Sequence, residues 1–310
     1  MLRFIGGEIT ICFDPRREQK KFAVMTAYDF PSARHCENAG IDMVLVGDSL
    51  GMVMLGYDNT CPVSMEEMLH HCRAARRGAP RSFILGDMPY GSYESGHEEA
   101  LRNAFRFIKE GQVDAVKLEG AGSRISTVRR LVEAGVPVCG HVGLQPQGVN
   151  VIGGFRAQGR TADKAMKIVE DAIALQDAGA FAIVIECVPS IVAKAVTDSI
   201  SIPTIGIGAG PHTTAQVLVF HDMLGINVFD DGAKASCPSF CKMYANVGVS
   251  VEMALKEYKA DVMRGSFPSP SHDSYDMPAE EMQKFQLKIA GPSRGKKSSD
   301  AFETDETTVY

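Results

Sequence analysis

Basic residues are in the minority in this 310-residue chain, which has 32 Lys and Arg against 38 Asp and Glu and so a formal net charge of −6. That balance excludes the positively charged surface by which proteins bind DNA or RNA. Long apolar runs are also missing, since none approaches the roughly 18 residues that indicate a membrane-spanning helix. We therefore expect neither a nucleic-acid partner nor a membrane partner.

Cysteine is sparse, with eight residues and no CxxC pair. This density excludes a small domain built on disulfides, and the isolated pair Cys237 and Cys241 argues against a structural zinc site. The first 20 residues contain three acids and no continuous apolar segment, unlike a secretory signal. These features favour a soluble protein of a reducing, intracellular compartment.

A single unit recurs along the chain: a helical pattern ends in glycine, a short apolar run follows, and the run stops at a polar residue. The clearest copies span residues 40–48, 78–87, 111–119, 135–141 and 179–186. Glycine ends helices because it readily adopts the left-handed conformation. Runs of Val, Ile and Leu without alternation suit strands buried on both faces of a parallel sheet. We predict further strands in 22–29 and 202–210, and an eighth within 226–247.

Helical patterns alternate with these strands. Ser64 and Ser95 each begin an S-x-x-E capping box, and helices are also predicted over 161–178, 212–224 and 249–264. Strict alternation gives an open doubly wound sheet or a closed barrel, and the GxGxxG fingerprint of a dinucleotide-binding sheet is absent. The predicted fold class is therefore α/β, a (β/α)8 TIM-type barrel.

The domain organisation follows from changes in character along the chain. We predict an N-terminal extension over 1–20 and the barrel over 21–265. A C-terminal arm and helix would occupy 266–290, and the polar residues 291–310 would form a disordered tail.

Polar residues stop the predicted strands, and in a barrel the C-terminal strand ends face one mouth, where active sites are built. These residues are Asp48, Ser49, Asp87, Glu119, His141 and Glu186. Carboxylates gathered at one mouth repel one another, and a bound cation would relieve that repulsion. A ligand set made only of oxygen atoms favours Mg²⁺ over zinc.

Lys117 and Glu119 lie two apart on one predicted strand and so share a face. A lysine that faces into the mouth needs an anion, either Glu119 or an anionic substrate. Ordinary alternatives remain open for single residues: a structural ion pair for Lys117, a helix cap for each aspartate, and a core position for His141. Glu186 is harder to explain in this way, because it ends an apolar run where a carboxylate needs a reason.

Several long motifs carry a resemblance. They are TAYDFPSA (26–33), LVGDSLGMV (45–53), GDMPYGSYE (86–94), VKLEG (116–120), VPVCGHVGLQPQ (136–147), GGFRAQGR (153–160), ECVP (186–189) and IPTIGIGAG (202–210). These segments are very similar to those of the ketopantoate hydroxymethyltransferase family. The resemblance covers about 21–225 and resumes around 238–270. The chain departs from the family at 226–237 and in PSFCKMY (238–244), where serine replaces a lysine of the motif.

The resemblance implies a role for each strand-end residue. The implied Mg²⁺ ligands are Asp48, Asp87 and Glu119. The implied substrate pocket consists of Asp48, Ser49, Asp87, Lys117 and His141. Glu186 is implied as the general base.

The activity that the resemblance implies is transfer of a hydroxymethyl group from 5,10-methylenetetrahydrofolate to 3-methyl-2-oxobutanoate. The product is 2-dehydropantoate, a precursor of pantothenate, formed through an enolate that Mg²⁺ stabilises. The family also implies a homo-oligomer, a decamer, located in mitochondria in eukaryotes and in the cytoplasm otherwise. Two alternatives remain open: a Mg²⁺-dependent keto-acid lyase or mutase of the phosphoenolpyruvate mutase/isocitrate lyase type, and a catalytically impaired ligand-binding homologue, which the altered segment 226–244 suggests.

Overall fold

The computed structural model describes residues 2–5, 8–11, 21–152, 154, 156–227, 237–269 and 273–291. The chain forms two compact units, Met1–Val251 and Glu252–Tyr310. The first unit holds an antiparallel pair of strands, β1 (Leu2–Ile5) and β2 (Glu8–Ile11), and a closed barrel. The second holds α11 (Ala279–Ala290) and most of α10 (Val247–Arg264).

Eight parallel strands form the barrel, and their order around it follows the chain. They are β3 (Phe22–Thr26), β4 (Met43–Val46), β5 (Phe83–Asp87), β6 (Ala115–Lys117), β7 (Val138–Gly143), β8 (Ala182–Glu186), β9 (Thr204–Ile207) and β10 (Ala215–Leu218). The barrel closes because β10 pairs with β9 on one side and with β3 on the other. The predicted fold class is confirmed.

The eighth strand lies earlier than predicted. β10 occupies part of the segment 212–224 that we expected to be helical, and only α9 (Phe220–Leu224) is a helix there. In the described part of 226–247 no residue belongs to a strand. The error has a simple cause: the exposed Gln216 interrupts β10, so this strand lacks the continuous apolar run that marks the others, whereas the adjoining α9 supplies apolar residues at helical spacing.

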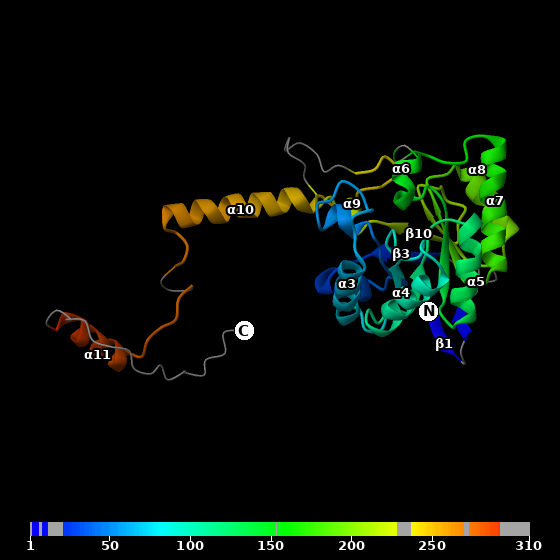
Figure 1. The fold of residues 1–310 in the computed structure, drawn as a ribbon. Helices are drawn as coiled ribbons and strands as arrows, with labels where there is room; N and C mark the ends of the chain where they lie inside the picture. The colour runs from blue at the N-terminus through cyan, green and yellow to red at the C-terminus, as the bar shows by residue number, and fades with distance from the viewer. Residues whose placement is uncertain are drawn as a thin grey trace. The chain divides into compact units, whose positions relative to one another are not determined.

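Helices surround the barrel on its outside (Figure 1). α3 contacts β4 and β5, α4 contacts β6, α5 contacts β7, and α7 contacts β7 and β8. The described helices of the first unit are α1 (Phe30–Asn38), α2 (Leu50–Val53), α3 (Met65–Gly78), α4 (His97–Lys109), α5 (Ile125–Glu133), α6 (Val149–Ile152), α7 (Ala162–Asp177), α8 (Ser190–Ser199) and α9, with short 3-10 turns at Gly122–Arg124 and Pro146–Gly148. None of the helices described in the structure has the length and apolar content required to cross a bilayer.

The predicted helix signals mostly hold. Ser64 forms the expected capping box with Glu67 at the start of α3. The box predicted at Ser95 is wrong, because α4 begins after Gly96 without a side-chain cap. The predicted helices over 161–178 and 249–264 correspond to α7 and α10, and the helix expected within 266–290 corresponds to α11. The tail predicted over 291–310 lies outside the described residues apart from its first residue.

The glycines that precede the strands act in two ways. Gly40, Gly135 and Gly179 have φ angles of 72°, 83° and 96°, so they end their helices in the left-handed conformation as predicted. Gly78 and Gly111 do not. A Cβ atom at Gly78 would lie 2.3 Å from a backbone oxygen of α1, so that glycine permits close packing of two helices.

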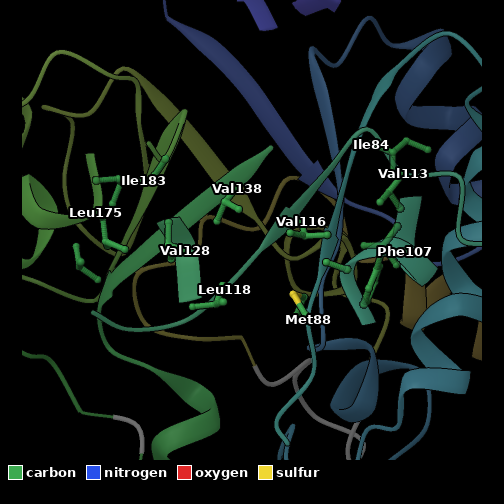
Figure 2. Close-up of a cluster of buried hydrophobic side chains, with 14 of the residues drawn as sticks. Ile84, Met88, Phe107, Val113, Val116, Leu118, Val128, Val138, Leu175 and Ile183 are labelled. Carbon is green, nitrogen blue, oxygen red and sulfur yellow. The ribbon is translucent and has the colours of Figure 1, made fainter. Parts of the chain in front are cut away.

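Alternation along the strands divides the core into two layers. One face of each strand packs outward against the helices, as Ile84, Val116, Val138 and Ile183 do in Figure 2. The other face fills the barrel interior, where the buried side chains include Leu45, Phe83, Leu85, Val184 and Val217. Phe107 of α4 fills part of the outer layer.

The same alternation continues to the strand ends. Asp87 lies on the same face of β5 as Phe83 and Leu85, and therefore faces the barrel interior. Lys117 is paired with Asp87 in the ladder between β5 and β6. Parallel pairing thus places polar side chains of neighbouring strands side by side above an apolar interior.

Candidate active site

The structure brings the predicted residues together at the C-terminal end of the barrel. Asp87, Lys117 and Glu186 are the last residues of β5, β6 and β8. His141 lies within β7, while Asp48 and Ser49 follow the end of β4 and Glu119 follows β6. Apart from Glu186 and Ser49, which are partly exposed, all of them are buried.

Lys117 is the cation at the centre of the cluster. Its Nζ atom donates to both carboxylate oxygens of Asp87 at 2.7 Å and lies 3.5 Å from Glu119 Oε1. We expected Glu119 or a substrate to be its anion, whereas Asp87 is the closer protein partner. The backbone N–H of Asp48 also faces Asp87 Oδ2, at 3.4 Å. Lys117 therefore links the Asp87 and Glu119 carboxylates, and Asp48 joins this group through its backbone N–H.

Burial dominates the electrostatics of this group. Loss of water raises the pKa of Asp48 well above its usual value, and the Asp87 and Glu119 carboxylates raise it further. Burial also raises the pKa of Asp87, against the effect of Lys117. Burial alone would raise the pKa of Glu119, but Lys117 and His141 outweigh it and hold that pKa below its usual value. Burial disfavours the charged form of Lys117, yet the three carboxylates raise its pKa well above normal.

His141 connects this group to Glu186. Its Nδ1 atom lies 3.5 Å from Glu119 Oε1, and its Nε2 atom lies 3.4 Å from Glu186 Oε2. These separations are too long for good hydrogen bonds, and neither ring nitrogen has a bonded partner among the described residues. His141 is completely buried, and its two ring nitrogens face one carboxylate each, so it links the two acids across the mouth.

Glu186 has the properties of a proton acceptor. Its side chain is 17% exposed, so it can meet a ligand in the mouth. Burial raises its pKa from the ordinary 4.5 to about 7, although the nearby His141 acts in the opposite direction. A carboxylate with this pKa is both available and basic at neutral pH.

Three contributors were missed by the sequence reasoning. The buried Tyr28 hydroxyl lies 2.8 Å from Ser49 Oγ. Gln147, in the turn after β7, bonds to Asp48 through its side chain and to Glu119 through its backbone, and the Tyr93 hydroxyl donates to its amide oxygen. Tyr28 follows β3 as the other site residues follow their strands, so its position was a usable signal. Gln147 and Tyr93 lie in loops and carry no such signal.

The donor set fits a hard divalent cation. Asp48, Asp87 and Glu119 offer only oxygen atoms, and the single charge of Lys117 does not balance three carboxylates. Asp48 Oδ1 accepts no hydrogen bond from any residue in the described part of the chain. Among the described residues, no group of three His, Cys, Asp or Glu side chains is arranged so that all three could bind one metal ion. Mg²⁺ does not require such a cage, because it commonly binds through one or two carboxylates and keeps several waters.

The closed barrel defines the fold class, a (β/α)8 barrel, and the buried ionisable cluster lies at its C-terminal strand ends, where enzymes of this fold build their sites. Solved structures share this fold at low sequence identity. An oxaloacetate acetylhydrolase is 14% identical, with a TM-score of 0.53 over 87% of this chain and 90% of its own. A phosphonopyruvate hydrolase, in a complex with oxalate and Mg²⁺, is 16% identical, with a TM-score of 0.51 over 88% and 92%.

Sequence comparison narrows the class to one family. Residues 10–270 match the profile of ketopantoate hydroxymethyltransferase. A protein of Arabidopsis thaliana named 3-methyl-2-oxobutanoate hydroxymethyltransferase 1, mitochondrial, is 53% identical over 87% of this chain and 78% of its own. A Heliobacterium modesticaldum protein named 3-methyl-2-oxobutanoate hydroxymethyltransferase is 50% identical over 84% and 92%. The chain belongs to the ketopantoate hydroxymethyltransferase family, which confirms the family and the enzyme class predicted from the motifs.

Proposed function

We propose that the protein transfers a one-carbon unit from 5,10-methylenetetrahydrofolate to C3 of 3-methyl-2-oxobutanoate. With one water, the products are 2-dehydropantoate and tetrahydrofolate. The observation that carries the proposal is the position of Glu186, a carboxylate with a pKa of about 7 that shares one barrel mouth with Lys117 and the buried acids. Membership of the family supports it.

The C3 proton lies next to a ketone and is only weakly acidic, so its removal requires a base and stabilisation of the charge that develops. Glu186 accepts this proton, a function that typically contributes roughly 10²–10⁴-fold to the rate. Its partial exposure lets it reach the substrate, and its burial keeps it basic. His141 lies between Glu186 and Glu119, and it contributes to the substrate pocket at this position.

Asp48, Asp87 and Glu119 hold Mg²⁺. When bound there, Mg²⁺ supplies Lewis-acid polarisation of the keto oxygen. Lys117 binds the carboxylate of the keto acid and exchanges part of its interaction with Asp87 for that contact. Ser49 donates to the same substrate group, with its hydroxyl oriented by Tyr28.

Proton NMR of 3-methyl-2-oxobutanoate in D₂O tests the first chemical step. The protein with Mg²⁺ is expected to remove the C3 proton signal, and a chelator is expected to prevent this. Persistence of the signal with a folded, Mg²⁺-loaded protein would refute the proposed chemistry. A lyase or mutase needs no one-carbon carrier. Those alternatives are excluded if proton exchange occurs and 2-dehydropantoate forms only when 5,10-methylenetetrahydrofolate is added. Keto-acid binding without exchange would identify an impaired homologue.

Assembly and location belong to the same proposal. The family resemblance supports a homo-oligomer, a decamer, whose size light scattering would measure. The relatives from Arabidopsis thaliana and Oryza sativa are named mitochondrial. We accordingly propose a mitochondrial location for a eukaryotic source and a cytoplasmic one for a bacterial source, and fractionation of the source cells tests this.

A further inference from the structure

Gln147 is a buried amide that contacts two of the acids at the mouth. It lies in the 3-10 turn Pro146–Gly148 after β7. Its side-chain Nε2 atom donates to Asp48 Oδ2 at 2.9 Å, and its backbone N–H donates to Glu119 Oε2 at 3.1 Å. Two carboxylates from different strand ends are thus tied to one residue.

The orientation of the amide is determined by its neighbours. Nε2 also donates to the backbone oxygen of Met88 at 2.9 Å, so both of its hydrogens are used. The Tyr93 hydroxyl donates to Oε1 on the opposite side. A flipped amide would place Oε1 against the Met88 oxygen and the Asp48 carboxylate, which can only accept at that site when ionised. The amide therefore has one favourable orientation, with its donors toward Asp48.

This contact fixes how Asp48 presents its oxygens. Gln147 occupies Oδ2, whereas Oδ1 accepts no hydrogen bond from the described residues. The backbone contact similarly occupies Glu119 Oε2, so that Oε1 faces Lys117 and His141. Neither contact adds charge, because an amide donor stabilises a carboxylate without neutralising it. A lysine in this position would instead compete with a cation.

We propose that Gln147, held by Tyr93, is a positioning residue that orients the Asp48 carboxylate toward a divalent cation; the role rests on the cation site of the proposed function. Residues that orient metal ligands through hydrogen bonds typically contribute about 10–100-fold to metal affinity. The selection of glutamine over glutamate follows from the same geometry. A carboxylate at this position would face Asp48 and the Met88 oxygen with acceptors only.

Gln147→Met is the direct test, because methionine keeps the length of the side chain and removes its donors. The full-length chain is titrated with Mn²⁺ without keto acid or folate, and free Mn²⁺ is measured by electron paramagnetic resonance. We expect affinity to fall by about 10–100-fold. Gln145→Met is the matched control: it is the same substitution in the same loop, and in the described part of the chain the Gln145 side chain donates no hydrogen bond. We expect it to bind Mn²⁺ as the unchanged protein does.

Tyr93→Phe provides the second variant, should Gln147→Met fail to fold as judged by circular dichroism. It removes the hydroxyl that holds Oε1 and leaves both Nε2 donors in place. A smaller loss of Mn²⁺ affinity in the same direction is expected. The inference is overturned if a folded Gln147→Met binds Mn²⁺ with unchanged affinity. If only Tyr93→Phe folds, unchanged affinity in that variant overturns it. So does an equal loss in Gln145→Met. The Mn²⁺ titration contains no keto acid, so its result does not depend on the C3 proton-exchange assay. Failure of that assay with the unchanged protein would count against the proposed function alone.

Discussion

Replacement of Glu186 by glutamine should remove proton exchange and should make the stability of the protein less dependent on pH. Glutamine has nearly the same shape but neither accepts a proton as a base nor becomes charged. We expect Glu186→Gln to bind keto acid and Mg²⁺, and to lose C3 proton exchange by roughly 10²–10⁴-fold. In the unchanged protein, exchange should rise with pH and level off above about pH 7, because the carboxylate must be deprotonated to act.

The stability effect follows from the raised pKa. In the folded protein the pKa of Glu186 is about 7, against an ordinary 4.5. The folded state therefore binds the proton more tightly than the unfolded chain does. This contributes stability that is fully present below pH 4.5 and is lost as the pH rises through 7, with a total of about 3 kcal/mol. The side chain is mostly buried, so little of this is screened by solvent.

Urea unfolding followed by circular dichroism at pH 5 and pH 8 measures the effect at one protein concentration without Mg²⁺. Between these conditions the unchanged protein should lose about 2–3 kcal/mol more than Glu186→Gln, since the neutral amide does not titrate. Equal losses in the two proteins would refute the raised pKa. Unchanged proton exchange in a folded Glu186→Gln would refute the assignment of the base.

Three further substitutions test other parts of the site. Asp87→Asn should raise the Mg²⁺ concentration needed for half-maximal proton exchange. The increase should exceed roughly 10–100-fold, which is typical when a residue that only orients a metal ligand is lost. Tyr28→Phe removes the hydroxyl 2.8 Å from Ser49 Oγ and should raise the KM for the keto acid about 2–10-fold, with kcat less affected. Gly143→Ala should cost about 2–3 kcal/mol in urea unfolding, because φ is 94° and the added Cβ would lie 2.2 Å from the Glu186 backbone oxygen.

Each of these predictions can be contradicted. Full activity of Asp87→Asn at low Mg²⁺ would remove Asp87 from the cation site. A fall in kcat with unchanged KM in Tyr28→Phe would show that this hydroxyl does not act through substrate binding. For Gly143→Ala, the control is Gly91→Ala. Gly91 also has a positive φ, of 86°, but its Cβ would meet no atom within 4 Å, so it should lose less stability. Equal losses at the two glycines would show that the close approach is not responsible.

The residues at the strand ends were predictable because two local rules combine there. Parallel strands of a barrel end at one mouth, and alternation fixes the face of each residue, which together bring Asp87, Lys117 and Glu186 into one cluster. Neither rule says which acid Lys117 contacts. That depends on ladder register, which pairs Lys117 with Asp87 directly and is decided by the packing of whole strands.

Other parts lay beyond local rules. Gln147 is 99 residues from Asp48 in sequence, and an amide in a loop has no pattern that indicates its partner. β10 was misplaced because the exposed Gln216 interrupts its apolar residues, and its identity as a strand depends on the two strands, β9 and β3, that pair with it. The strands predicted from longer apolar runs, such as β5 and β8, were found where expected because each run is bounded by a glycine and a carboxylate.

Barrel closure has a consequence for how the chain is made. β3 and β10 pair across the seam, and the Phe220 N–H donates to Thr26 Oγ1 over a sequence separation of 194 residues. Until β10 has left the ribosome, β3 has an open edge that could pair with another nascent chain. Contacts this distant in sequence also slow folding. Synthesis of the protein therefore includes a long interval in which a chaperone that shields β-strand edges would increase the yield.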